Sequence, residues 1–135
     1  MENNPQVAIM MPVYNGEKTL PLAVASLIHQ TYSHWKCYIV NDGSTDGTKA
    51  YLDSLRDDRF VIIHFEKNKG RPYARQAALD LAEGKYLDFL DADDFYHSEK
   101  LEKQVKEFKD NNELALVSCI LASFDSNDTL KSTKS

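Results

Sequence analysis

An acidic cluster in the second half of the chain has the residue types and spacing of a metal site. Asp91-Ala92-Asp93-Asp94 directly follows the apolar run Tyr86–Leu90. Carboxylates this close raise each other's pKa unless a cation neutralises them. Carboxylate oxygens beside a diphosphate are the usual surroundings of Mg²⁺ or Mn²⁺. The spacing therefore suggests a divalent cation at Asp91 and Asp93, with the alternative that Asp93 and Asp94 only cap a following helix.

Two further polar loops follow apolar runs of strand length. Tyr14-Asn15-Gly16 follows residues 7–13, and Asp42-Gly43-Ser44-Thr45-Asp46-Gly47 follows residues 35–40. In an open α/β sheet, ligands bind beyond the carboxyl ends of the strands, near the point where strand order reverses. The three loops are therefore expected to face one crevice. An anionic nucleotide can bind there if a metal bridges carboxylate and phosphate oxygens.

The elements that must position these loops are predicted from hydrophobic periodicity. Apolar runs of strand length are Val7–Val13, Trp35–Val40, Phe60–Phe65, Tyr86–Leu90 and Leu114–Ala122. Between them, apolar residues recur at helical spacing in four segments, the second and fourth with Asp46 and Ser98 as expected N-caps. This alternation predicts an α/β fold, a three-layer α/β/α domain with a mainly parallel sheet.

Composition limits the classes of function. The chain has 135 residues, the size of one domain, and a formal net charge of −5. An acidic chain is a poor candidate for binding the nucleic-acid backbone, so no nucleic-acid partner is expected. No run approaches the roughly 20 apolar residues of a membrane-spanning helix. The first residues do not have the pattern of a secretion signal.

Four motifs in order carry a resemblance to a known family. They are Pro12-Val13-Tyr14-Asn15, Val40-Asn41-Asp42-Gly43-Ser44-Thr45-Asp46-Gly47-Thr48, Asn68-Lys69-Gly70 and Phe89-Leu90-Asp91-Ala92-Asp93-Asp94. Together they resemble the family 2 glycosyltransferases, from about Val7 to Ala122. The resemblance implies the Rossmann-like GT-A fold, with the first strand between the second and fourth and the third outside the second. It also implies a nucleotide-sugar donor.

The resemblance implies roles for individual residues. The implied nucleotide-binding residues are Pro12, Tyr14, Asn15, Asp42, Arg75, Asp91 and Ala92. Tyr14 would lie against the base, and Asp42 would accept a hydrogen bond from it. An acceptor carboxylate suits the N3–H of uracil, so UDP is the expected nucleotide. Asp93 would be the metal ligand that holds the diphosphate, with Mn²⁺ or Mg²⁺, and Asp91 would contact the ribose or the metal.

The implied activity is inverting transfer from a UDP-sugar to a glycan or lipid-linked acceptor. The family's general base follows in a second half, so residues 1–124 are expected to be a GT-A nucleotide-sugar-binding domain. Residues 125–135 would then be a polar tail at the start of a missing acceptor-side portion. Such a fragment is expected to be inactive alone and to self-associate through apolar surface. The expected location is cytoplasmic, including the inner face of the membrane.

One alternative of the same fold stays open, namely a non-catalytic nucleotide-binding or partner module. A phospho-acceptor receiver domain is disfavoured because the lysine it needs after the fifth strand does not occur before Lys131. Asp88, inside the fourth expected strand, has no partner that the sequence identifies.

Overall fold

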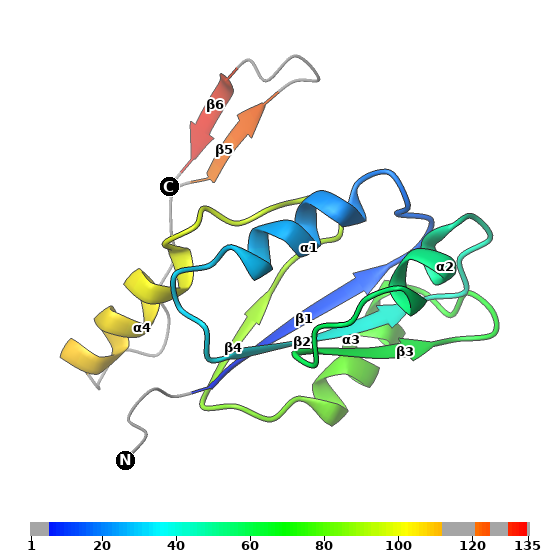
Figure 1. The fold of residues 1–135 in the computed structure, drawn as a ribbon, viewed down its shortest axis with the longest axis horizontal. Coiled ribbons are helices and arrows are strands. Elements are labelled where there is room, and N and C mark those ends of the chain that lie inside the picture. The colour runs from blue at the N-terminus through cyan, green and yellow to red at the C-terminus, as the bar shows by residue number, and fades with distance from the viewer. Residues whose placement is uncertain (1–5, 112–120, 125–129, 135) are drawn as a thin grey trace.

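A four-stranded parallel sheet forms the centre of the computed structural model, which describes residues 6–111, 121–124 and 130–134 (Figure 1). Its strands are β1 (Val7–Val13), β2 (Trp35–Asn41), β3 (Phe60–His64) and β4 (Tyr86–Phe89). They lie in the order β3-β2-β1-β4, and each neighbouring pair is parallel. The predicted central position of the first strand is confirmed.

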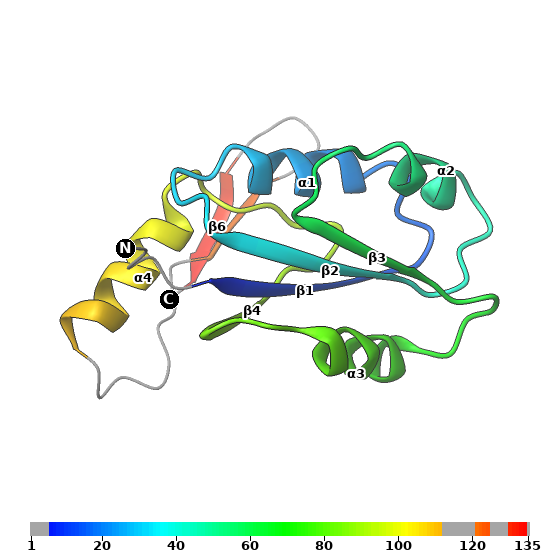
Figure 2. The same ribbon diagram turned by 60° about the horizontal axis from the view of Figure 1, so that its bottom comes forward.

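Helices cover both faces of this sheet. They are α1 (Leu20–Ile28), α2 (Thr48–Asp53), α3 (Arg71–Leu81) and α4 (Lys100–Asp110). Figure 2 shows α1 and α2 on one face and α3 on the other, which is the predicted three-layer arrangement. Within the described residues, no helix is long and apolar enough to cross a membrane.

The central strand β1 is buried on both faces, which is why it is a continuous apolar run in the sequence. Ile9 and Met11 belong to the cluster that contains the buried face of α1, whereas Met10 packs in a second cluster with Ala74 and Ala78 of α3. The small alanine side chains let α3 lie close to the sheet. A strand fixed from both sides gives the loop at its end a rigid base.

The predicted fifth strand is not found in the central sheet as described. Of Leu114–Ala122, residues 114–120 lie outside the described residues. The remainder begins β5 (Leu121–Phe124), which pairs antiparallel with β6 (Leu130–Lys134) in a separate two-stranded sheet. Apolar composition predicts a strand but not its partner, and strands that are close in the chain often pair with each other.

The two predicted helix caps are wrong in detail. Gly47 and Glu99 occupy the N-cap positions of α2 and α4, and neither has a side-chain capping bond. The Asp46 carboxylate instead accepts the backbone N–H of Thr48 at 2.9 Å and its hydroxyl, bonds that lower the pKa of Asp46. The carbonyl of Ser98 accepts the backbone N–H of Thr31 at 2.9 Å. Asp46 therefore still accepts from the first residue of α2, but from one position before the N-cap, and Ser98 uses its carbonyl in a contact with Thr31.

Candidate functional site

An open cleft of about 450 Å³ lies at the carboxyl ends of β1, β2 and β4. It is lined by Pro12, Val13, Tyr14, Asn15, Gly16, Thr19, Asp42, Asn68, Gly70, Arg71, Asp91, Ala92 and Asp93. The lining includes every predicted nucleotide-binding residue except Arg75, and both predicted metal ligands. The volume falls within the range of about 300–1,000 Å³ that small-molecule sites occupy.

Asp42 is the buried carboxylate of the cleft, with 4% of its surface exposed. Its two side-chain oxygens accept the backbone N–H groups of Lys69 at 2.7 Å and Gly70 at 3.1 Å, and the side-chain amide of Asn68 at 3.1 Å. Three donors therefore solvate the carboxylate inside the protein, as a buried charge requires. Asp42 thus ties the end of β2 to residues 68–70, the loop between β3 and α3.

Gly43 makes the close approach of these two loops possible. Its φ is 69°, a left-handed conformation that favours glycine. A Cβ on Gly43 would also overlap the backbone of Lys67 and Asn68. We call Asp42, Gly43 and residues 67–70 the Asp42 corner. Its geometry requires glycine at position 43 for both conformation and space.

Asn15 fixes the loop after β1 to the loop after β2. It adopts a φ of 50°, and its backbone N–H donates to Ser44 Oγ at 2.9 Å. Its side-chain oxygen accepts the backbone N–H of Thr45 at 2.7 Å. The Gly16 N–H donates to the Thr48 hydroxyl at 2.9 Å. Tyr14, which is 51% exposed, is thereby held at the rim of the cleft.

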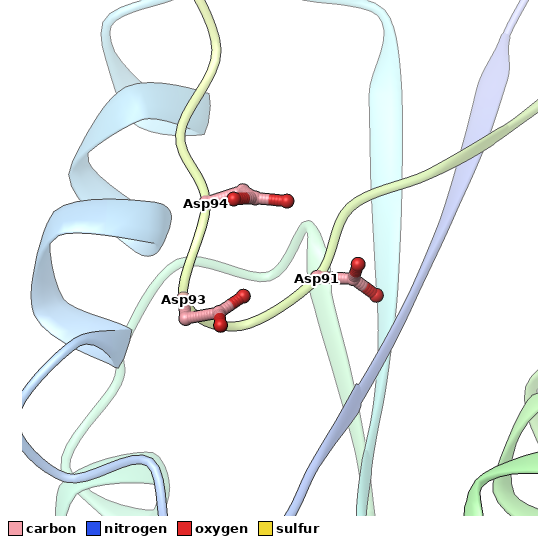
Figure 3. Close-up of side chains that lie close together, drawn as sticks. All are labelled: Asp91, Asp93 and Asp94. Carbon is pink, nitrogen blue, oxygen red and sulfur yellow. The ribbon is translucent and has the colours of Figure 1, made fainter. Parts of the chain in front are cut away.

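The acidic loop, residues 91–94, provides the metal-type ligands. Asp91, Asp93 and Asp94 each place one carboxylate oxygen so that these atoms lie within 4.8 Å of one another. Figure 3 shows Asp93 and Asp94 projecting from one arm of the loop toward the arm that carries Asp91. Partial burial and the neighbouring charges of Asp93 and Asp91 raise the pKa of Asp94. Clustered carboxylate oxygens with excess negative charge fit Mg²⁺ or Mn²⁺, and Asp94 is a potential ligand that was not among the predicted metal ligands.

The alternative that Asp93 and Asp94 cap a helix is wrong. The helix that follows them, α4, begins at Lys100 and has Glu99 at its N-cap position. Both aspartates therefore lie well before the first turn of α4, and capping does not account for them.

Arg75 lies beside the acidic loop and outside the cleft lining. Its Nη2 is 3.9 Å from Asp91 Oδ1, and the two side chains are 46% and 45% exposed. An ion pair this long and this exposed contributes little to stability. Asn68, Gly70 and Arg71 line the cleft but were not predicted as site residues. The motif at 68–70, placed just after a strand, was the signal that could have identified Asn68 and Gly70.

Comparisons with known proteins identify the family of this chain. Residues 8–135 match the model of Glycosyl transferase family 2. The chain is 37% identical over 106 residues to the Escherichia coli UDP-Glc:alpha-D-GlcNAc-diphosphoundecaprenol beta-1,3-glucosyltransferase WfgD, covering 78% of this chain and 42% of the relative. It is 35% identical over 99 residues to WfaP of Escherichia coli, whose description names the same reaction, covering 73% and 39%.

A solved structure gives the same fold. S. aureus TarS 1–349 in complex with UDP-GlcNAc superposes with a TM-score of 0.75 at 28% identity, covering 79% of this chain and 32% of TarS. The chain thus spans about two-fifths of the two curated relatives and a third of that structure. The predicted GT-A fold is confirmed, and the chain belongs to glycosyl transferase family 2.

Proposed function

We propose that this chain is the nucleotide-sugar-binding part of a glycosyltransferase that uses a UDP-sugar and a divalent cation. The observation that carries the proposal is that Asp42 and the acidic loop line one cleft from opposite sides of β1. One is a buried hydrogen-bond acceptor, and the other is a group of clustered carboxylates. A nucleoside diphosphate has complementary groups, a base with ring N–H donors and a diphosphate that binds metal.

UDP is the proposed nucleotide because of the hydrogen-bond capacity left at Asp42. A carboxylate has about four acceptor positions, and three side-chain bonds are used. One position remains for a ring donor such as uracil N3–H, which adenine lacks. The relative WfgD is named for UDP-Glc, and TarS has been solved with UDP-GlcNAc. Tyr14 would stack on the base, with Pro12, Asn15 and Ala92 forming the surrounding wall.

The acidic loop is the proposed cation site, with Asp93 as the principal ligand and Asp91 as a ligand or ribose contact. A bound Mg²⁺ or Mn²⁺ would join the carboxylates to the diphosphate and neutralise charge on the departing nucleotide. Arg71 in the cleft wall and Arg75 beside Asp91 would add positive charge near the diphosphate.

Transfer itself is proposed to be inverting, toward a glycan or lipid-linked acceptor. Direct displacement needs a base for the acceptor hydroxyl. The carboxylates that line the cleft, Asp42, Asp91 and Asp93, already have other assignments. We therefore place the base elsewhere and expect the 135-residue chain to bind nucleotide without transferring sugar. WfgD is named for a diphosphoundecaprenol-linked acceptor, which supports a lipid-linked acceptor here. We also propose that the protein is cytoplasmic and acts at the inner membrane face.

Self-association is also proposed for the 135-residue chain. Leu87 and Phe89 are 53% and 55% exposed and stand on the same face of β4. Exposed apolar side chains grouped on one strand favour contact with another copy. Light scattering over a concentration series would measure it, and a monomer at every concentration would exclude it.

Calorimetric titration of UDP, with Mn²⁺ or with chelator, tests the binding proposal. UDP should bind in both conditions, more tightly with Mn²⁺, and ADP should bind more weakly. Asp93→Asn should nearly erase the Mn²⁺ gain, because it removes the charged ligand but keeps the side-chain shape. Asp58→Asn makes the same change at an exposed position outside the cleft lining and should keep the gain.

Two outcomes would contradict the proposal. Equal binding of ADP and UDP would exclude base recognition by Asp42. An equal Mn²⁺ gain in Asp93→Asn and wild type would exclude Asp93 as a metal ligand.

A further inference from the structure

We propose that Tyr96, Lys100 and Asp88 are positioning residues that hold the acidic loop in its metal-binding shape, a brace between β4 and α4. The inference rests on the proposed function, because it concerns the same cation site. Its three residues are not among those that line the cleft.

The tyrosine closes the base of the acidic loop. Tyr96 is 8% exposed, and its hydroxyl donates to the carbonyl of Phe89 at 2.9 Å. Phe89 is the last residue of β4, and Tyr96 comes two residues after Asp94. The bond therefore joins the chain just before the loop to the chain just after it.

The lysine makes a second link across the same gap. Lys100 Nζ donates to Asp88 Oδ2 at 2.7 Å and to Gln104 Oε1 at 2.9 Å. The side chains of Lys100 and Asp88 are only 13% and 23% exposed, so solvent screens this ion pair less than a surface pair. The ammonium also lies 4.0 Å from the centre of the Tyr96 ring. Asp88, which the sequence left without a partner, thus connects β4 to the first residue of α4.

The chain beyond Tyr96 is held independently by Gln30, which is 7% exposed. Its side-chain amide donates to the carbonyl of His97 at 2.6 Å, and its side-chain oxygen accepts the backbone N–H of Leu101 at 3.1 Å. The residues on which the brace depends are therefore fixed to the α1 side of the core as well as to β4.

A brace has a function here because the loop carries three like charges. Mutual repulsion of Asp91, Asp93 and Asp94 favours an open loop when no cation is bound. The links from Tyr96 to Phe89 and from Lys100 to Asp88 join the chain before the loop to the chain after it, and so oppose that opening. A cation would then find its ligands already close together. Loss of the brace should then weaken cation binding and leave the Asp42 corner unchanged.

Tyr96→Phe tests the brace because it removes one hydroxyl and keeps the ring. The matched control is Tyr86→Phe, which removes the hydroxyl of a tyrosine on β4 whose ring stacks on Phe108. Binding of Mn²⁺ alone, followed by electron paramagnetic resonance, should weaken about tenfold in Tyr96→Phe and stay unchanged in Tyr86→Phe. Amide hydrogen exchange of residues 91–96 should accelerate only in Tyr96→Phe. Lys100→Met, tested in the same way, should reproduce both effects.

UDP titration separates positioning from general damage. In Tyr96→Phe, affinity with chelator should equal that of wild type, and the Mn²⁺ gain should fall. In an Asp93→Asn background, Tyr96→Phe should have no further effect on that gain, because Tyr96 acts only by positioning the carboxylates that bind the cation. Unchanged Mn²⁺ affinity and exchange in Tyr96→Phe would overturn the brace, as would equal weakening with Mn²⁺ and chelator.

The brace and the proposed function fail in different ways. If wild type binds no UDP, or binds it without a Mn²⁺ gain, the proposed function is wrong. Mn²⁺ binding and hydrogen exchange of the loop would still test the brace by themselves.

Discussion

The Asp42 corner and the acidic loop are both acidic strand ends at one cleft, yet they handle their charge in opposite ways. Asp42 is 4% exposed and its carboxylate is met by three N–H donors. The loop places three carboxylates within 4.8 Å of one another, and the pKa of Asp94 is raised by burial and by its neighbours. Protein N–H donors meet the charge of the corner, whereas the loop keeps excess negative charge that a bound cation would neutralise.

This difference separates stability from binding. Changes in the corner should reduce the free energy of unfolding, because protein groups are its partners. Substitutions that neutralise a carboxylate of the acidic loop should lower the free energy of unfolding little, or even raise it. The proposed partner of these carboxylates is a bound cation and not a protein group. The following three variants test that separation, from the largest expected effect to the smallest.

Gly43→Ala should be the most damaging substitution, lowering the free energy of unfolding by about 3 kcal/mol or more. The new Cβ is strained at a φ of 69° and overlaps the backbone of Lys67 and Asn68. Gly47→Ala is the matched control, since the atoms nearest to its Cβ would belong to the flexible side chain of Glu17. Urea denaturation of both measures the effect. Equal losses of unfolding free energy in the two variants would mean that the corner does not require glycine at position 43.

Asp42→Asn should cost about 2–3 kcal/mol of unfolding free energy, because the amide cannot accept from all three donors and presents its own N–H₂ to one of them. Asp46→Asn, in the same loop, keeps an acceptor for the Thr48 N–H and should cost much less. Thermal or urea unfolding with chelator present measures both. A loss below that of Asp46→Asn would show that the corner does not depend on Asp42.

Asp94→Asn should stabilise the chain at pH 7 by about 0.3–0.5 kcal/mol at low salt. The raised pKa means that the folded chain takes up a proton where the unfolded chain does not. Ionised Asp94 therefore disfavours folding at neutral pH, and that penalty is relieved as the pH falls through the raised value. The stability advantage of Asp94→Asn over wild type should therefore shrink as the pH falls from 7 to 4.

Urea unfolding of Asp94→Asn, wild type and an Asp58→Asn control across that pH range checks the sign. Saturating Mn²⁺ should remove the variant's advantage, because wild type then gains a bound cation. An Asp94→Asn chain that is less stable than wild type at pH 7 would contradict the contrast with the corner.

The sequence predicted the acidic loop better than the Asp42 corner. A strand followed by clustered aspartates is a local pattern, and strand ends gather at one edge of a parallel sheet. The donors of Asp42 lie about 27 residues away, on a loop whose path depends on the left-handed conformations of Gly43 and Gly70. Nothing in the local sequence states that a carboxylate will meet those N–H groups.

Long-range pairing limited the fold prediction in the same way. Val7–Val13 was predicted with its observed bounds because a doubly buried strand has an unmistakable composition. The partner of Asp88 was not predictable, since Lys100 lies twelve residues on, across an irregular loop and at a helix start. The end of the fifth apolar run lies in β5, which pairs with β6, and the composition of the run could not predict that partner.

The central place of β1 also sets the order in which the two halves of the cleft can assemble during synthesis. β1 meets β2 within the first 41 residues, but its other edge waits for β4, which ends at Phe89. At about 5–20 residues per second, the ribosome needs several seconds to add those roughly 50 residues. The Asp42 corner, complete in sequence by Gly70, can therefore fold while the acidic loop is still unmade. A nascent chain would therefore complete the Asp42 corner first and the acidic loop last.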